Sequence, residues 1–423
     1  MPARTSSDDP YAALRFPEYR NLIIASFLFT VALLIQEVAL GYELYTITRD
    51  PLALGFTGLA EAIPFIGLSL YGGHIADRQS KRKIILWGVG IITLGSFVLQ
   101  LVARQDAQVH FPIPVLVGVI YGMVFLIGLC RAFQSPAAMS LRAFLVPIEV
   151  YTNAATWSSS AWQAGSIVGP TAGGFLFAWI GFPNTLLAVV GLLIVSLALF
   201  SRIRGRKEVF EPATEKLIES VKEGLNFVWN TKPILYAISL DLFSVLFGGV
   251  VAILPIYAQD ILKVGSEGLG ILRAAPSAGA MITLIILSRI SPMDHAWRNL
   301  LASVAAFGVA ILVFAVSPWM TLSVIALFFS GAFDSVSVVI RQTLLQILTP
   351  DSMRGRVMAV NGIFVSSSNE LGAFESGTAA RIMGVVPSAV FGGIMTLATV
   401  AWMGWRARGM SESYDIQHRR RNK

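Results

Sequence analysis

Charged residues, cysteine and histidine are all scarce in this chain. Only 13% of its 423 residues are charged and 55% are hydrophobic, whereas about a quarter of the residues in an average soluble domain are charged. A soluble fold cannot bury so much apolar surface, which excludes a soluble enzyme, a secreted disulfide framework and a disordered chain. The one cysteine, Cys130, cannot form an intramolecular disulfide. The four histidines have no spacing typical of metal ligands, so no metal site is predicted.

Long apolar stretches are abundant instead. Stretches of about 20 apolar residues recur along most of the chain, which is the length that crosses a hydrocarbon core of about 30 Å. The run from Ile84 to Leu101 does not alternate apolar and polar residues, which excludes a barrel strand. We therefore expect an all-α polytopic membrane protein with twelve transmembrane helices in two pseudo-symmetric six-helix bundles. The expected helices cover residues 21–45, 53–76, 84–103, 113–145, 154–180, 184–201, 233–258, 266–288, 298–316, 319–347, 357–380 and 386–405.

Basic residues mark the cytoplasmic side. With twelve spans and a cytoplasmic N-terminus, 25 of the 32 Lys and Arg residues fall in cytoplasmic segments and only four on the opposite side. This asymmetry follows the positive-inside rule and predicts two cytoplasmic termini in a bacterial-type plasma (inner) membrane. Topology thus accounts for the net charge of +7, and no nucleic-acid partner is expected. The predicted segments are a cytoplasmic N-terminus (1–20), a bundle (21–201), a cytoplasmic linker with an amphipathic helix (202–232), a second bundle (233–405) and a basic cytoplasmic tail (406–423).

The two halves repeat the same sequence marks. Leu-x-Pro follows the fourth span at 145–147 and the tenth at 348–350, an offset of 203 residues that also carries Gly128 onto Gly331 and Arg131 onto Asp334. Leu-Gly at 54–55 and 269–270 gives an offset of 215 for the second and eighth spans. Chance matching is the alternative, but agreement with two sets of six spans favours an internal repeat.

A charged loop follows the second span and contains Gly73, Asp77, Arg78 and Arg82. Asp77 is expected to face a neighbouring helix N-terminus while the basic residues reach anionic headgroups, which would form a gating latch. An ordinary positive-inside loop is the alternative, and it does not explain Gly73 and Asp77. The pattern resembles the Gly-x-x-x-Asp-Arg-x-Gly-Arg-Lys signature of the major facilitator superfamily, with Ser80 in place of the second glycine.

Span five carries the most specific motif. Gly165, Gly169, Pro170, Gly173 and Gly174 match every defined position of the superfamily's antiporter motif, Gly-x-x-x-Gly-Pro-x-x-Gly-Gly. Such glycines let another helix approach closely and the proline kinks the span, as a rocking interface between two halves requires. The alternative is a close-packing face without a role in transport.

Further segments resemble one branch of this superfamily. Arg131 and Gln134 match the Arg-x-x-Gln of its span-four motif. Segments 349–357 and 366–377 are similar to those of enterobactin exporters and macrolide-efflux-like proteins, the transmembrane secretion effector family. The resemblance covers nearly the whole chain. It implies a secondary transporter without cofactor, not an enzyme, that exports a small amphiphilic molecule such as a siderophore, a macrolide or a drug.

Ionisable residues inside the spans are the candidates for proton coupling. Placing an ionisable side chain at mid-membrane costs at least about 2.5 kcal/mol of insertion free energy, so each one calls for a partner or a function. The resemblance implies that spans one, four, seven and ten line a central cavity, so Arg131 and Asp334 are expected to face each other across it. A structural latch pair is the alternative. Glu37, Glu61 and Asp241 complete the candidates for the coupling carboxyl, with Glu37 first.

Other side chains in the spans are weaker candidates. Glu370 and Glu375 of span eleven are expected to pair with Arg341 and Arg273. Substrate contacts are expected from Phe27, Gln134, Phe243 and Phe247, for which packing or lipid contact is the alternative.

The residues and the resemblance to this branch together predict a monomeric, proton-coupled exporter that works by alternating access. The chain has no phosphate-binding loop for ATP and no nucleophile elbow. Two alternatives stay open: a proton-coupled uptake symporter for a nutrient, and a non-transporting membrane sensor or lipid-remodelling protein.

Overall fold

Prolines and glycines set where the helices begin and end. The computed structural model describes residues 9–104, 112–204 and 217–407, and most of these are helical. Pro17 and Pro51 stand at the first position of their helices, where the missing N–H leaves no hydrogen bond unmade. Gly181 and Gly384 have φ angles of 75° and 93°, which let the chain turn between consecutive helices. Most of the predicted basic tail, residues 408–423, lies outside the described residues.

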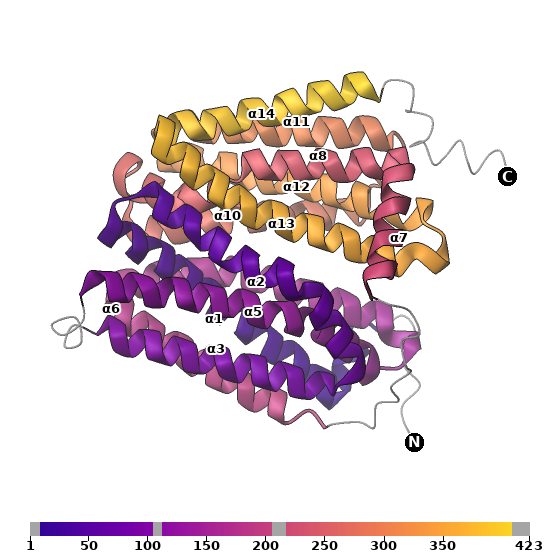
Figure 1. Ribbon diagram of the computed structural model, residues 1–423, viewed down its shortest axis with the longest axis horizontal. Helices are drawn as coiled ribbons and strands as arrows, with labels where there is room; N and C mark the ends of the chain where they lie inside the picture. Colours follow the sequence, from indigo (N-terminus) through magenta and orange to yellow (C-terminus); the bar gives the residue numbers. More distant parts are fainter. Residues whose placement is uncertain (1–8, 105–111, 205–216, 408–423) are drawn as a thin grey trace. The chain divides into compact units, whose positions relative to one another are not determined.

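The chain divides into two compact units. Unit 1 comprises Met1–Ile47 and Ala60–Pro212, and unit 2 comprises Thr48–Leu59 and Ala213–Lys423. The first helices in the chain are α1 (Pro17–Thr48), α2 (Pro51–Arg78), α3 (Lys81–Ala103), α5 (Ile113–Leu145) and α6 (Tyr151–Ser201). The helices that follow are α7 (Leu217–Asn230), α8 (Lys232–Gly248), α9 (Leu254–Ile256), α10 (Gly265–Leu287), α11 (Ala296–Val316), α12 (Met320–Leu348), α13 (Asp351–Met383) and α14 (Val385–Arg406), as Figure 1 shows.

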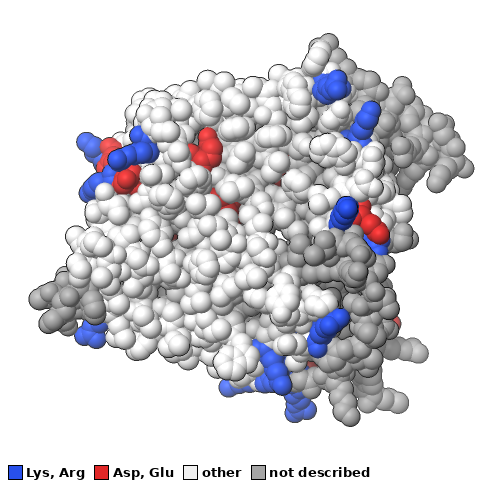
Figure 2. All heavy atoms as spheres, viewed as in Figure 1, with Lys and Arg blue, Asp and Glu red and all other residues white. Residues whose placement is uncertain are grey.

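Ten elements in the described part of the chain are long and apolar enough to cross a membrane. One of them, Ile148–Ser201, has 54 residues, which is enough for two crossings, and its helix α6 is interrupted at Gly181. Helix α13 is 33 residues long but is much less apolar than the ten. These two helices account for the difference from twelve predicted spans. The predicted ranges fall on helices, except that the seventh, 233–258, is interrupted at Gly249. On the face that Figure 2 shows, the described surface is largely uncharged, and Lys and Arg gather towards the helix ends.

Residues 48–59 belong to unit 2, although the predicted boundaries place them in the first bundle. This segment packs on α13 through glycines, since a Cβ at Gly377 would lie 2.6 Å from the Cα of Gly55. Phe56 and Phe374 extend the same contact. Two ion pairs of 3.2 Å flank it, namely Arg49–Asp260 and Asp50–Arg381.

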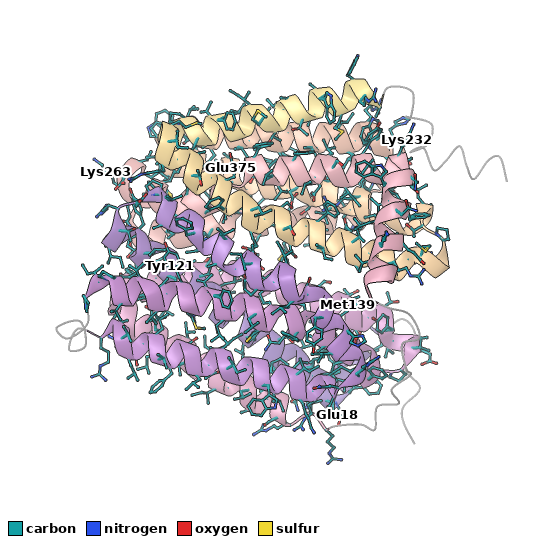
Figure 3. All side chains as sticks on the ribbon, viewed as in Figure 1. Glu18, Tyr121, Met139, Lys232, Lys263 and Glu375 are labelled. Carbon is teal, nitrogen blue, oxygen red and sulfur yellow. The ribbon has the colours of Figure 1, made fainter. Side chains whose placement is uncertain are left out.

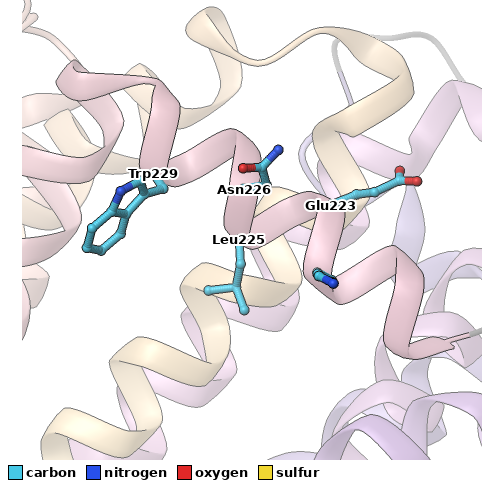
Figure 4. A pocket seen from close by; sticks show the side chains of 5 residues that line it. Glu223, Leu225, Asn226 and Trp229 are labelled. Carbon is cyan, nitrogen blue, oxygen red and sulfur yellow. The ribbon is translucent and has the colours of Figure 1, made fainter.

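Helix α7 lies within the predicted linker and crosses the ends of α8 and α13 (Figure 1). Val228 is buried on this contact, in a cluster with Val357 and Val360 of α13. Glu223 forms a 2.5 Å ion pair with Arg356. The opposite face is exposed, and it lines an open hollow of about 710 Å³ that Figure 4 shows. Its lining residues are Lys222, Glu223, Leu225, Asn226 and Trp229.

Candidate functional site

A charged cluster lies inside unit 1, where α2 and α5 cross. Gly128 makes the crossing possible, because a Cβ there would stand 2.4 Å from the carbonyl oxygen of Glu61. One turn later in α5, Arg131 forms an ion pair with the Glu61 carboxylate. Its guanidinium also lies over the ring of Phe65, 5.4 Å from the centroid. The contact places one cation and one carboxylate together within two spans.

Glu37 on α1 brings a second carboxylate to this cluster. It interacts electrostatically with Glu61. The preceding residue, Gln36, is fully buried and accepts a 2.7 Å hydrogen bond from the hydroxyl of Ser96 on α3. This bond ties one face of α1 to α3 and leaves Glu37, the next residue along the helix, exposed. Sequence reasoning missed Gln36 and Ser96, because single uncharged polar residues are common in spans.

The same crossing recurs in unit 2 between α10 and α12. A Cβ at Gly331 would lie 2.0 Å from the carbonyl oxygen of Pro276. In unit 1, a Cβ at Gly128 would approach the carbonyl oxygen of Glu61 in the same way. The offsets of these contacts are 203 and 215 residues, the two values that the sequence repeat predicts. Asp334 therefore occupies the place of Arg131, but an uncharged proline occupies the place of Glu61.

Asp334 consequently has no neighbour of opposite charge at this crossing. Among the described residues it makes no hydrogen bond and no ion pair, and it is partly exposed. The expected pairing of Arg131 with Asp334 joins residues of different units and stays a prediction. Within its own unit, Arg131 pairs with Glu61.

Asp241 on α8 forms a buried ion pair with Arg341 on α12. The two side chains are 8% and 3% exposed. The expectation that Arg341 pairs with Glu370 or Glu375 of span eleven is wrong, because α12 packs against α8 and presents the guanidinium to Asp241. Asp241 is thus held by a structural partner.

The span-five glycines pack on α1 of the same unit. A Cβ at Gly165 would lie 2.9 Å from the side chain of Thr30, and one at Gly173 would lie 3.0 Å from the Cα of Ile35. At Gly169 it would lie 2.7 Å from Leu34. Pro170 and Gly174 are buried in α6 as well. The motif therefore packs α6 closely on α1 within unit 1, and its role in transport stays a prediction.

The loop motif after the second span is placed only in part, since the Asp77 side chain lies outside the described residues. Gly73 has open space around it, whereas a Cβ at its neighbour Gly72 would lie 2.1 Å from the carbonyl oxygen of Ala132 on α5. Arg78 is exposed at the end of α2. Arg82 donates a 2.7 Å hydrogen bond to the carbonyl oxygen of Ser201, at the C-terminus of α6.

The four predicted substrate contacts occupy different environments. Gln134 is buried and points its amide at α3, where it fills the space beside Gly88. Phe247 packs edge-on against Phe391 of α14. Phe27 is partly buried on α1, and Phe243 is 37% exposed on α8. Figure 3 shows that side chains fill the space between the helices of each unit.

Comparison with known proteins adds the family. The model of the transmembrane secretion effectors, a group of the major facilitator superfamily (MFS), matches residues 8–421. The chain belongs to this family. It is therefore a multi-pass membrane transporter of the MFS and not an enzyme, as the sequence predicts.

Members of known activity are similar over most of the chain. The enterobactin exporter EntS of Shigella flexneri is 27% identical over 390 residues, which cover 88% of this chain and 87% of that protein. EntS of Escherichia coli O1:K1 is 27% identical over 382 residues, with 88% of each chain covered.

Solved structures at lower identity support the fold alone. A bacterial homologue of the iron transporter ferroportin, in an inward-facing state, matches with a TM-score of 0.73 at 16% identity, over 94% of this chain and 99% of that one. A D-xylose–proton symporter matches with a TM-score of 0.72 at 13% identity, over 92% and 97%.

Proposed function

We propose that this MFS protein is a proton-coupled exporter of a small amphiphilic molecule, acting as a monomer in a bacterial-type inner membrane with both termini in the cytoplasm. The observation that carries the coupling is the cluster in unit 1, where Arg131 pairs with the carboxylate of Glu61 and Glu61 interacts electrostatically with Glu37. Two carboxylates and one guanidinium inside the spans form a group that can take up and release a proton. The similarity to enterobactin exporters supports export.

Alternating access would use this cluster as a switch. When a proton binds one carboxylate, the attraction that holds α2 to α5 weakens, and a conformation with different contacts becomes more populated. Asp334, without an opposite charge at the matching crossing, is the group available to Arg131 or to a cationic substrate in that other conformation. Glu37, Glu61 and Asp334 are the coupling carboxyls of this proposal. Asp241 is a weaker candidate because Arg341 holds it.

The decisive experiment measures accumulation of labelled enterobactin, macrolides and dyes in cells with and without the protein. We expect lower accumulation with the protein, which rises when the proton gradient is collapsed. Gradient-dependent uptake would instead indicate the symporter, the alternative that shares this fold. No effect on any solute would contradict the proposed export for all compounds in the panel.

Variants then locate the coupling. We expect Arg131→Ala and Asp334→Asn to reduce efflux at least about tenfold, and Glu37→Gln to flatten its dependence on external pH. Glu43→Gln is the matched control, because Glu43 is a partly exposed carboxylate on the same helix α1 outside the cluster. Near-normal efflux in both Arg131→Ala and Asp334→Asn would leave these residues a purely structural role.

A further inference from the structure

The seventh predicted span is discontinuous in the middle. Helix α8 ends at Gly248, and Gly249 leaves the helical conformation with φ −75° and ψ 53°. A 3₁₀ turn (Val250–Ile253), the short α9 and a π-helical turn (Tyr257–Ile261) complete the segment. A helix end leaves its last carbonyl groups without the usual partners and carries a partial negative charge. In transporters, such breaks are where backbone carbonyls bind ions.

Helices α13 and α14 approach this break closely because they present glycines to it. A Cβ at Gly372 of α13 would lie 3.0 Å from the carbonyl oxygens of both Val245 and Leu246. A Cβ at Gly392 of α14 would lie 2.1 Å from the carbonyl oxygen of Phe247. The carbonyl end of α8 is therefore enclosed by backbone, with no bulky side chain between them.

One turn after Gly372, α13 supplies a hydroxyl and a carboxylate. Ser376 is buried, and its hydroxyl donates a 3.1 Å hydrogen bond to the carbonyl oxygen of Gly249. The same hydroxyl lies 3.5 Å from the Oε2 atom of Glu375. Three oxygen atoms, from a carboxylate, a hydroxyl and the backbone carbonyl of Gly249, thus lie close together beside the break.

The surroundings are electronegative and are not neutralised by a basic residue. Among the described residues, Glu375 has only the Ser376 hydroxyl as a polar partner and forms no ion pair. It is half-buried, and Figure 3 places it on α13. At this position in the same view, Figure 2 shows acidic atoms at an otherwise uncharged surface. The Glu375 carboxylate is therefore not fully buried within unit 2.

We propose that the break in α8 is a binding site for a monovalent cation, held by the Glu375 carboxylate, the Ser376 hydroxyl and the carbonyl oxygen of Gly249. The hydroxyl would turn its hydrogen to Glu375 and offer a lone pair to the cation. A single carboxylate with two neutral oxygens matches one positive charge, which either Na⁺ or the ammonium head of an amine supplies. The site lies wholly in unit 2 and does not depend on proton coupling or on the direction of transport.

The test is thermal unfolding of the purified full-length protein in nanodiscs. Sodium chloride and methylammonium chloride are each titrated against choline chloride at constant ionic strength. We expect one of the two cations to raise the Tm by at least about 2 °C, saturably, because a ligand that binds only the folded state stabilises it. The cation that acts identifies the source. Glu375→Gln should abolish the shift and Ser376→Ala should weaken it, while Glu43→Gln should retain it.

Two results would overturn the proposal: no shift with either cation, or an equal shift in Glu375→Gln. Should Glu375→Gln fail to fold, equilibrium binding of ²²Na⁺ to the wild-type protein, with displacement by methylammonium, replaces the variant. Absence of saturable binding or displacement then overturns the site. Efflux that does not depend on the proton gradient would refute the proposed proton coupling but would leave cation binding unchanged. Failure of the cation site and failure of the proposed function are therefore distinguishable.

Discussion

At the scale of single residues, the buried pair of Asp241 and Arg341 makes the sharpest prediction about stability. Removing one partner leaves an uncompensated charge inside unit 2, so we expect Asp241→Ala or Arg341→Ala to cost roughly 3–5 kcal/mol of unfolding free energy. Replacing both by apolar residues, Asp241→Leu with Arg341→Met, should restore much of the loss. The measurement is unfolding of the purified protein in detergent.

The exposed pair Arg49–Asp260 is the matched control for this comparison. Its side chains are 59% and 43% exposed, so removing either partner should change stability by no more than about 1 kcal/mol. Equal losses for the buried and exposed pairs would contradict the claim that burial determines the cost.

Single residues also show how far the sequence could predict the site. Glu61 and Arg131 stand out because charges are rare in apolar spans, but their pairing could not be predicted. The repeat relates Arg131 to Asp334 in the other half, whereas its described contact with Glu61 is within one half. That contact depends on Gly128, whose close approach to α2 only the three-dimensional structure reveals.

At the scale of helices, the crossing of α2 and α5 predicts a large effect of one methyl group. We expect Gly128→Ala to destabilise the protein by roughly 1–3 kcal/mol or more, because the new Cβ would meet the Glu61 backbone, which cannot rotate away. The helices would separate and the ion pair with Arg131 would weaken. Thermal unfolding and efflux should therefore both decline.

Gly122→Ala provides the control on the same helix. Nothing lies within 4 Å of the position of its Cβ, so the alanine should be neutral or stabilise α5 by up to roughly 1 kcal/mol. A Gly128→Ala protein as stable as Gly122→Ala would show that this close approach is not required.

Helix α7 offers a second test at this scale. Val228 is buried against α13, whereas Leu225 is 43% exposed on the opposite face. Val228→Asp should release α7 from α13 and speed cleavage of the linker in limited proteolysis, because a carboxylate cannot be buried there without a partner. Leu225→Asp should leave the cleavage rate unchanged. Equal cleavage rates for Val228→Asp and Leu225→Asp would show that α7 does not pack on α13 through the face that contains Val228.

Helix boundaries were largely predictable, since long apolar runs end at Pro, Gly and charged residues. The break in α8 was not, because Gly248 and Gly249 stand within an uninterrupted apolar stretch and glycines are common in spans. What distinguishes them is the contact with Gly372 and Gly392, residues more than 100 positions further along the chain.

At the scale of the whole molecule, the uneven distribution of basic residues predicts the orientation in the membrane. Alkaline phosphatase fused after Arg104 or Ser317, at the ends of the third and ninth predicted spans, should be active because it is exported. The same enzyme fused after Gln79 or Lys423 should be inactive, and green fluorescent protein fused after Lys423 should fluoresce. The reason is that 25 of the 32 basic residues lie on the side predicted to be cytoplasmic. The reverse pattern of activity would show that the topology is the opposite of the predicted one. The substrate of an exporter would then enter from the other side.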